Sequence, residues 1–321
     1  MKRIKIGLAL LAALFFLNGC APRNASIASQ RKIYFVVKSV DTQFWRSAIG
    51  GANAAKAEYN VELTVVGPET EEDYAQQNAC IEQAIAERAD AIIFSAISYT
   101  DNADAIQAAA EAGIKIVIID SDVDSRRVHA RIGTDNIQAG RMTGMAVLDT
   151  DEDALCVGIV NFDLSSRNGQ EREQGLRQVL EQDGRVSQIY TINVAATPED
   201  AQAGSMTLLA RHPEINVLVG LNEPLAVGVG RAANALGRSG RMRVIGFDTN
   251  VECVDMMRGG TISALITQNP YAMGYLGVEY AWKLLEGETV DPNTWLDTAT
   301  TIVSRENMFT PESQRALFSF D

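Results

Sequence analysis

The sequence predicts an α/β fold in which parallel strands are covered by helices on both faces. Short apolar runs rich in β-branched residues alternate with amphipathic segments along nearly the whole chain. Strands that are apolar throughout are typical of parallel sheets, because a strand with one solvated face would show alternating polar residues. The length of 321 residues is compatible with two domains.

The apolar runs define the predicted strands, and the amphipathic stretches between them define the predicted helices. The strands are expected at 33–37, 61–66, 91–95, 115–120, 155–160, 186–192, 217–221, 242–247 and 262–267, and the helices at 71–88, 101–112, 171–182, 199–212 and 271–286. Thr70 suits a helix N-cap, Pro198 and Pro270 suit first helical positions, and Gly113 suits a helix end. This many units fits either one barrel or two doubly wound lobes.

Polar residues follow the predicted strands where each apolar run ends. They include Ser39, Asp41, Ser95, Asp120, Ser121, Asp122, Asn222, Glu223, Asp248 and Gln268. Parallel strands bring their carboxyl ends to one edge of the sheet, where α/β proteins bind ligands. A barrel has the same polarity, so the pattern predicts a polar ligand site and leaves the architecture open.

The N-terminus predicts export from the cytoplasm. Residues 1–5 are basic, and residues 6–17 carry no charge. An apolar run of this length is shorter than the roughly 20 residues that span a bilayer, and it fits a secretory signal. Leu17-Asn18-Gly19-Cys20 resembles a lipobox, which is cleaved before a cysteine that carries lipid. We therefore expect a signal peptide at 1–19, lipidation of Cys20 and a polar linker at 20–30; the alternative is an ordinary signal peptide with an incidental Cys20.

The charge and the cysteines limit the possible partners and cofactors. Loss of residues 1–19 removes three cations and takes the formal charge from −13 to −16, which disfavours nucleic acid and anionic lipid. No second long apolar run follows Leu17, so the remaining chain is expected to be soluble. Cys80, Cys156 and Cys253 can form at most one disulfide, and their spacing shows no metal-ligand pattern. No cofactor or metal is expected.

Several segments, in order along the chain, resemble segments of the type I periplasmic sugar-binding proteins, especially the ribose-binding branch. They are Gln43-Phe44-Trp45, Ile118-Ile119-Asp120, the stretch 133–140, Glu171-Arg172-Glu173-Gln174-Gly175-Leu176, Gly220-Leu221-Asn222-Glu223, Val244-Ile245-Gly246-Phe247-Asp248, and Ile266-Thr267-Gln268 followed by Pro270. The likeness runs from about Lys32 to Val303. The common order of these segments over the mature chain carries the resemblance.

The resemblance implies two doubly wound parallel-sheet lobes joined by a three-strand hinge. The N-terminal lobe would hold 31–134 plus 269–298, and the C-terminal lobe 135–268 plus 299–321. The chain would cross between them near Thr134/Asp135, Gln268/Asn269 and Thr298/Ala299. Closure of such lobes around a ligand is a known hinge motion.

The resemblance also implies the ligand-binding residues. They are Phe44, Trp45, Asp120, Arg172, Asn222, Asp248 and Gln268, with Ser95 and Ser121 at positions where the ribose branch usually has Asn and Arg. Thr42 replaces a family Asn, and Trp45 replaces the second aromatic residue of the family, so the identity of the sugar stays open. Carboxylates accept hydrogen bonds from hydroxyls, Asn and Gln both donate and accept, and Arg donates in a planar fork. With two aspartates and one arginine, this set favours a neutral polyol.

We therefore expect a monomeric extracytoplasmic binding protein that delivers a neutral pentose or hexose to an ABC transporter permease. The membrane contact would be the lipid anchor alone, and the protein would bind no nucleic acid. A sensing role with a chemoreceptor, a histidine kinase or an autoinducer-2 system is the alternative. A sugar-responsive repressor is disfavoured by the signal segment and the charge. An enzyme is disfavoured because the sequence shows no nucleophile–base pair, metal cluster or phosphate loop.

Overall fold

The computed structural model describes residues 30–291 and 295–318. Over these residues the chain forms two six-stranded sheets, each parallel except for one edge strand of the second sheet. The predicted doubly wound α/β class is confirmed, and the barrel alternative is wrong. The signal peptide, Cys20 and most of the predicted linker lie outside the described residues.

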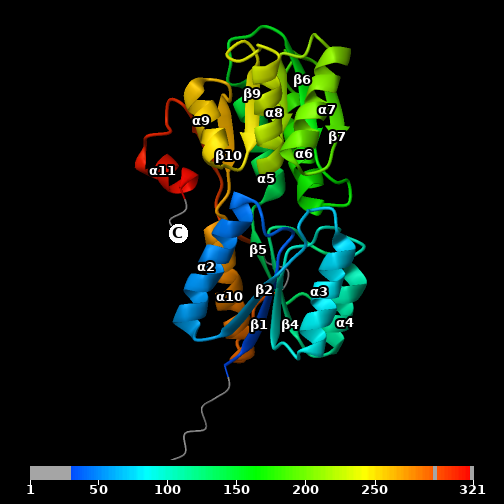
Figure 1. The fold of residues 1–321 in the computed structure, drawn as a ribbon. Helices are drawn as coiled ribbons and strands as arrows, with labels where there is room; N and C mark the ends of the chain where they lie inside the picture. The colour runs from blue at the N-terminus through cyan, green and yellow to red at the C-terminus, as the bar shows by residue number, and fades with distance from the viewer. Residues whose placement is uncertain (1–29, 292–294, 319–321) are drawn as a thin grey trace, which may run out of the picture. The chain divides into compact units, whose positions relative to one another are not determined.

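The first sheet has the strand order β11-β5-β4-β3-β1-β2. Figure 1 labels β1, β2, β4 and β5 of this sheet, together with the helices that cover it. Its strands are β1 (Lys32–Val36), β2 (Glu62–Val66), β3 (Ala91–Phe94), β4 (Lys115–Ile119), β5 (Ala130–Gly133) and β11 (Trp295–Asp297). Helices α2 (Gln43–Tyr59) and α10 (Pro270–Leu285) cover one face, and α3 (Tyr74–Ala86) and α4 (Ala103–Glu111) cover the other. Strand β1 shows why both faces are apolar: Ile33 and Phe35 pack toward α2 and α10, whereas Tyr34 and Val36 pack toward α3 and α4.

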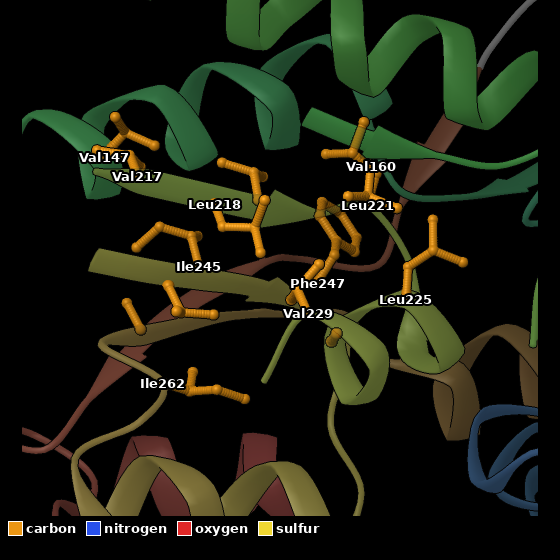
Figure 2. Close-up of a cluster of buried hydrophobic side chains, with 14 of the residues drawn as sticks. Val147, Val160, Val217, Leu218, Leu221, Leu225, Val229, Ile245, Phe247 and Ile262 are labelled. Carbon is orange, nitrogen blue, oxygen red and sulfur yellow. The ribbon is translucent and has the colours of Figure 1, made fainter. Parts of the chain in front are cut away.

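The second sheet has the order β12-β10-β9-β8-β6-β7. Its strands are β6 (Leu155–Asn161), β7 (Val186–Asn193), β8 (Val217–Gly220), β9 (Arg243–Phe247), β10 (Ala264–Thr267) and the antiparallel β12 (Thr301–Ser304). The helices of this part of the chain are α5 (Asn136–Leu148), α6 (Arg167–Leu180), α7 (Pro198–Arg211), α8 (Glu223–Ala235), α9 (Val251–Gly259) and α11 (Pro311–Leu317). Figure 2 shows the buried apolar core around β8 and β9, where Leu218, Ile245 and Phe247 lie near Val229 of α8. Each sheet with its helices is called a lobe below.

The chain passes from one sheet to the other after β5, after β10 and after β11. The helix after each of the first two passages packs on another helix: α5 packs against α6, the next helix along the chain, and α10 packs against α2, which is distant in sequence. Glycines allow this close approach, since a Cβ on Gly274 would lie 1.8 Å from the carbonyl oxygen of Ala48. The residues that connect the sheets are therefore adjacent to two tightly packed helix pairs, α5 with α6 and α10 with α2.

The structure confirms the predicted strands to within two residues at each end, and it adds β5, β11 and β12. Pro198 and Pro270 occupy first helical positions, and Gly113 follows α4 with a φ of +87°. The N-cap prediction for Thr70 is wrong, because Asp73 accepts the hydrogen bond from the Gln76 N–H and α3 begins at Tyr74.

Two further features of the described residues concern the cysteines and the lengths of the helices. Cys80, Cys156 and Cys253 are buried free thiols, so no disulfide joins any two of them. None of the helices within the described residues is long and apolar enough to span a bilayer.

Candidate functional site

Side chains from both lobes meet in one pocket near the carboxyl ends of the strands. We call this the interlobe pocket; the cavity that its side chains leave in this arrangement has a volume of about 20 Å³. Seven of the nine predicted ligand residues line it. The lining consists of Lys38, Thr42, Phe44, Trp45, Glu71, Asp120, Phe162, Asn168, Arg172, Asn222, Glu223, Pro224, Asp248 and Gln268.

Asp120 and Asp248 occupy equivalent places in the two lobes. Asp120 directly follows β4 and has a φ of +56°, and Asp248 directly follows β9 and has a φ of +68°. Their backbone N–H groups donate to Ile132 and Ile266 of the neighbouring strands, at 3.0 and 2.7 Å. A left-handed conformation at a non-glycine residue costs roughly 1–3 kcal/mol and is concentrated at functional sites. The same strained turn therefore aims a buried carboxylate into the pocket from each lobe.

A hydrogen-bonded chain holds Asp248 in place. Gln268 Nε2 donates to Asp248 Oδ1 at 2.6 Å, and Thr134 Oγ1 donates to Gln268 Oε1 at 2.7 Å. Burial raises the pKa of Asp248 to about 7, against the opposing effects of the Arg172 charge and the Gln268 hydrogen bond. Near neutral pH the carboxyl group therefore exists in both its protonated and its ionised form.

Arg172 is fully buried, and its planar group is fixed on three sides. Nε donates to Asn136 Oδ1 and Nη1 donates to the Leu221 carbonyl oxygen, both at 2.9 Å. The guanidinium carbon lies 3.9 Å from the centre of the Phe247 ring. Nη2 is 3.8 Å from Asp120 Oδ1, beyond hydrogen-bond distance, and it is a buried donor without a hydrogen-bond partner. The two N–H groups of Nη2 on this rigid fork are thus left for acceptors in the pocket.

Asn222 presents a second unused donor. Its Oδ1 accepts from the Leu225 N–H at 3.1 Å and caps helix α8, which fixes the orientation of the amide. Its Nδ2 is buried without a hydrogen-bond partner. Because the oxygen is engaged by the helix, the group that Asn222 offers to the pocket is an N–H donor.

The aromatic residues lie in the first turn of α2. Phe44 and Trp45 are buried, and their ring centroids are 5.0 Å apart in an edge-to-face arrangement. Trp45 Nε1 donates to Glu71 Oε1 at 2.8 Å. Burial raises the pKa of Glu71, while the nearby Lys38 charge opposes this. The indole N–H is therefore satisfied within the protein, and both rings contribute apolar surface.

Sequence reasoning missed several lining residues, among them Lys38 and Asn168, which are hydrogen-bonded to each other. Lys38 is buried, and its Nζ donates to Ser166 Oγ at 3.0 Å and to Asn168 Oδ1 at 3.3 Å. Asn168 Nδ2 in turn donates to Asp120 at 3.2 Å, which joins the two lobes. Lys38 comes just after β1, so the rule that polar residues follow strands would have found it.

The structure places Ser95 and Ser121 outside the set of residues that line the interlobe pocket. Ser95 Oγ donates to Asp120 Oδ2 at 2.9 Å and so supports the carboxylate from behind. Ser121 has a buried hydroxyl for which the described residues provide no partner.

The sequence pattern of the family described as the periplasmic binding protein domain matches residues 33–289. The chain belongs to the periplasmic binding protein family. The D-ribose/D-allose-binding protein of Pseudomonas aeruginosa is 27% identical over 297 residues, covering 90% of this chain and 92% of that protein. The ribose import binding protein of Bacillus subtilis is 22% identical, covering 89% of this chain and 94% of that protein.

Solved structures of periplasmic binding proteins share the fold. A solute-binding protein from Agrobacterium vitis with bound D-fucose has a TM-score of 0.85 and 28% identity, covering 89% of this chain and 99% of that chain. A carbohydrate transporter solute-binding protein from Agrobacterium radiobacter, in complex with D-arabinose, has a TM-score of 0.87 and 24% identity, covering 91% of this chain and all of that one.

Proposed function

We propose that this periplasmic binding protein captures a neutral monosaccharide, a pentose or a hexose, in the interlobe pocket and delivers it to an ABC transporter. The observation that carries the proposal is the arrangement of unused donors beside buried carboxylates. Arg172 Nη2 and Asn222 Nδ2 are buried without hydrogen-bond partners, and Asp120 and Asp248 face the same space. A sugar hydroxyl can accept from a donor of this kind and donate to a carboxylate at once.

The charges of the pocket favour an uncharged ligand. Four carboxyl groups, those of Glu71, Asp120, Glu223 and Asp248, line the space together with the cations of Lys38 and Arg172. Burial raises the pKa of three of these acids, Glu71, Glu223 and Asp248, and lowers the pKa of both Lys38 and Arg172, so it disfavours the charged form of the acids and of the cations alike. The cations do not outnumber the acids, so the pocket would give a phosphorylated or carboxylated sugar no net electrostatic attraction. The rings of Phe44, Trp45 and Phe162 suit the C–H faces of a sugar ring.

The named relatives support a sugar over other solutes. They include proteins named for ribose, allose and apiose, and a solved structure at 28% identity holds D-fucose. The family match at residues 33–289 includes every residue that lines the interlobe pocket. The replacements at Thr42, Trp45, Ser95 and Ser121 leave the choice among pentoses and hexoses to experiment.

Ligand capture would involve a hinge between lobes of residues 31–134 plus 269–298 and residues 135–268 plus 299–321. Hydrogen bonds between the lobes support this view. Tyr99 N–H donates to the Ser165 carbonyl oxygen at 2.9 Å, and Ala196 N–H donates to Glu72 Oε1 at 2.6 Å. A sugar that bridges both lobes stabilises their closed arrangement. Small-angle scattering should then show a smaller radius of gyration with saturating sugar, together with a change in Trp45 fluorescence.

The protein would work outside the cytoplasm, as a monomer held to the membrane by lipid on Cys20. The basic start, the short apolar run and the lipobox-like Leu17-Asn18-Gly19-Cys20 support this part of the proposal. It would act as a binding protein and not as an enzyme.

A thermal-shift screen against pentoses, hexoses, polyols, sugar phosphates and amino acids tests the function directly. A ligand that binds only the folded state raises the melting temperature. We expect a shift with at least one neutral monosaccharide, and calorimetry should then give saturable binding. A shift with a charged solute and with no neutral sugar would contradict the proposal.

A further inference from the structure

A buried lysine joins the two lobes inside the interlobe pocket. Lys38 follows β1 in the first lobe and is only 2% exposed. Its Nζ donates to Ser166 Oγ at 3.0 Å and to Asn168 Oδ1 at 3.3 Å, and both partners belong to the second lobe. A buried ammonium group is costly unless it is paired. The second lobe therefore supplies the partners that Lys38 needs when the lobes are closed.

Asn168 connects this lysine to a carboxylate that is expected to bind sugar. Its Nδ2 lies 3.2 Å from Asp120 Oδ1 and 3.3 Å from Asp120 Oδ2, to which it donates across the lobes. Ser95 Oγ donates to Asp120 Oδ2 at 2.9 Å. A carboxylate has about four positions at which it accepts a hydrogen bond. Asn168 and Asp120 both line the pocket, so the amide of Asn168 uses acceptor positions that a sugar hydroxyl would need.

The space that remains between the lobes is too small for a sugar ring. Its volume is about 20 Å³, and each water molecule needs roughly 10–15 Å³ of such space. Lys38 lines this space from the first lobe, and Asn168 lines it from the second. A sugar ring can enter only if the two lobes move apart here, which separates Lys38 from Ser166 and Asn168.

The contacts of Lys38 are of a kind that can be exchanged. Burial lowers the pKa of Lys38, and the Arg172 charge acts in the same direction, whereas Asp120 and Glu71 oppose it. The ammonium group also lies against Ser166 and Asn168 at the N-terminus of α6, where the helix dipole disfavours a cation. Water solvates the ammonium group once the lobes separate, so release of these contacts has a compensating gain.

We propose that Lys38, Ser166 and Asn168 form a latch that holds the lobes in a closed arrangement from which sugar is excluded. The protein without sugar would exchange between this latched form and an open form, and only the open form would admit a sugar to Asp120. The second half of this proposal rests on the proposed function, whereas the latch itself can be tested without any sugar.

Ser166→Ala tests the latch without touching the sugar site. Ser166 lies outside the pocket lining, and its side chain makes no capping hydrogen bond to α6. Small-angle scattering without sugar should show a larger radius of gyration in Ser166→Ala and in Asn168→Ala than in the parent, with cooperative thermal unfolding retained. Calorimetry with a neutral monosaccharide should show affinity about three- to tenfold higher in Ser166→Ala, because more of the protein is open.

Ser205→Ala is the matched control, because Ser205 is buried in α7 and its hydroxyl donates to the Ala201 carbonyl oxygen. It should match the parent in scattering and in affinity. Parent-like scattering of both latch variants would overturn the proposal. Weaker sugar binding by Ser166→Ala would also overturn it, because the contacts would then belong to the sugar-loaded form. If neither the parent nor the variants bind a sugar, the proposed function fails, and scattering alone supports or overturns the latch.

Discussion

The carboxylate of Glu223 accepts a hydrogen bond of 2.8 Å from the backbone N–H of Phe44. A side chain of the second lobe thereby caps the first turn of helix α2 in the first lobe. Glu223 also accepts from the Gln43 N–H at 3.3 Å and from Asn250 Nδ2 at 3.0 Å. The first N–H groups of a helix lack partners within the helix and attract negative charge, so this contact favours the closed arrangement of the lobes.

Replacement of Glu223 by Gln should shift the lobes toward an open arrangement. The amide keeps the size of the side chain but removes the charge that interacts with the α2 N-terminus, an effect of about 0.3–2 kcal/mol. We expect sugar affinity to fall about two- to thirtyfold and the radius of gyration without sugar to rise. Glu82→Gln, an exposed position on α3, is the control and should change neither quantity. Parent-like scattering and affinity in Glu223→Gln would mean that this cap does not stabilise closure.

The Asp248 carboxyl group should make folding stability depend on pH. Burial raises its pKa from 3.8 to about 7, so the folded state holds this proton more tightly than the unfolded state does. Its contribution to the free energy of unfolding is therefore present at low pH and is lost as pH rises through about 7. A tenfold difference in proton affinity between the two states corresponds to roughly 1.4 kcal/mol.

Urea unfolding of the parent and of Asp248→Asn between pH 4 and pH 8 checks this expectation. The parent should lose stability relative to Asp248→Asn as pH rises across this range. Parallel curves for the two proteins would show that the pKa of Asp248 is not raised in the folded state.

Asp248→Ala should abolish or strongly weaken sugar binding while the fold survives. The change leaves sugar hydroxyls and Gln268 Nε2 without an acceptor in a closed space, which costs about 1–3 kcal/mol or more. Calorimetry should therefore show at least a five- to hundredfold loss of affinity. Asp104→Ala, an exposed change on α4, serves as the control. Unchanged affinity in Asp248→Ala would remove this residue from the set of ligand contacts.

Gly274→Ala should destabilise the first lobe severely. The new Cβ would lie 1.8 Å from the Ala48 carbonyl oxygen, so α10 and α2 would have to move apart. Overpacking of this kind typically costs about 1–3 kcal/mol, occasionally more. Gly259→Ala in α9 is the matched control, because its Cβ would meet no atom within 4 Å. Thermal unfolding should show a large loss for the first variant and equal or higher stability for the second.

Cys20→Ala should release the protein from the membrane fraction. The lipobox-like site at Leu17–Cys20 motivates this expectation, because lipid on Cys20 would be the membrane contact of the mature protein. Mass spectrometry of the natively expressed parent should show a lipid adduct on an N-terminal Cys20. A mature chain that starts elsewhere, with an unmodified Cys20, would contradict the lipoprotein proposal.

The fold was largely predictable because its strands are apolar on both faces. The exceptions have physical reasons. Strand β5 is only four residues long and carries Arg131 in its interior, and β11 and β12 are short edge strands with partly exposed residues. The start of α3 was misplaced because Thr70 and Asp73 are both good caps, and only the turn formed before Tyr74 decides between them.

The predicted site contained the residues that follow strands and match family motifs, such as Asp120 and Asp248. Glu71 was missed because it lies in a loop, and only tertiary packing brings it to Trp45. The role of Glu223 as a cap of α2 depends on a contact between residues 179 positions apart, which no local pattern encodes. Ser95 was predicted from its strand-end position, but its bond to Asp120 depends on the pairing of β3 with β4.

The two sheets repeat one strand order, with β6 to β10 taking the places of β1 to β5. The repetition extends to single residues, since Asp120 follows the fourth strand of one half and Asp248 the fourth strand of the other. The helix after the fifth strand in each half packs in the opposite lobe, as α5 does on α6 and α10 on α2. This pattern would result if two copies of an ancestral unit first exchanged this helix as a dimer. Gene duplication would then have fused the two copies into a single chain.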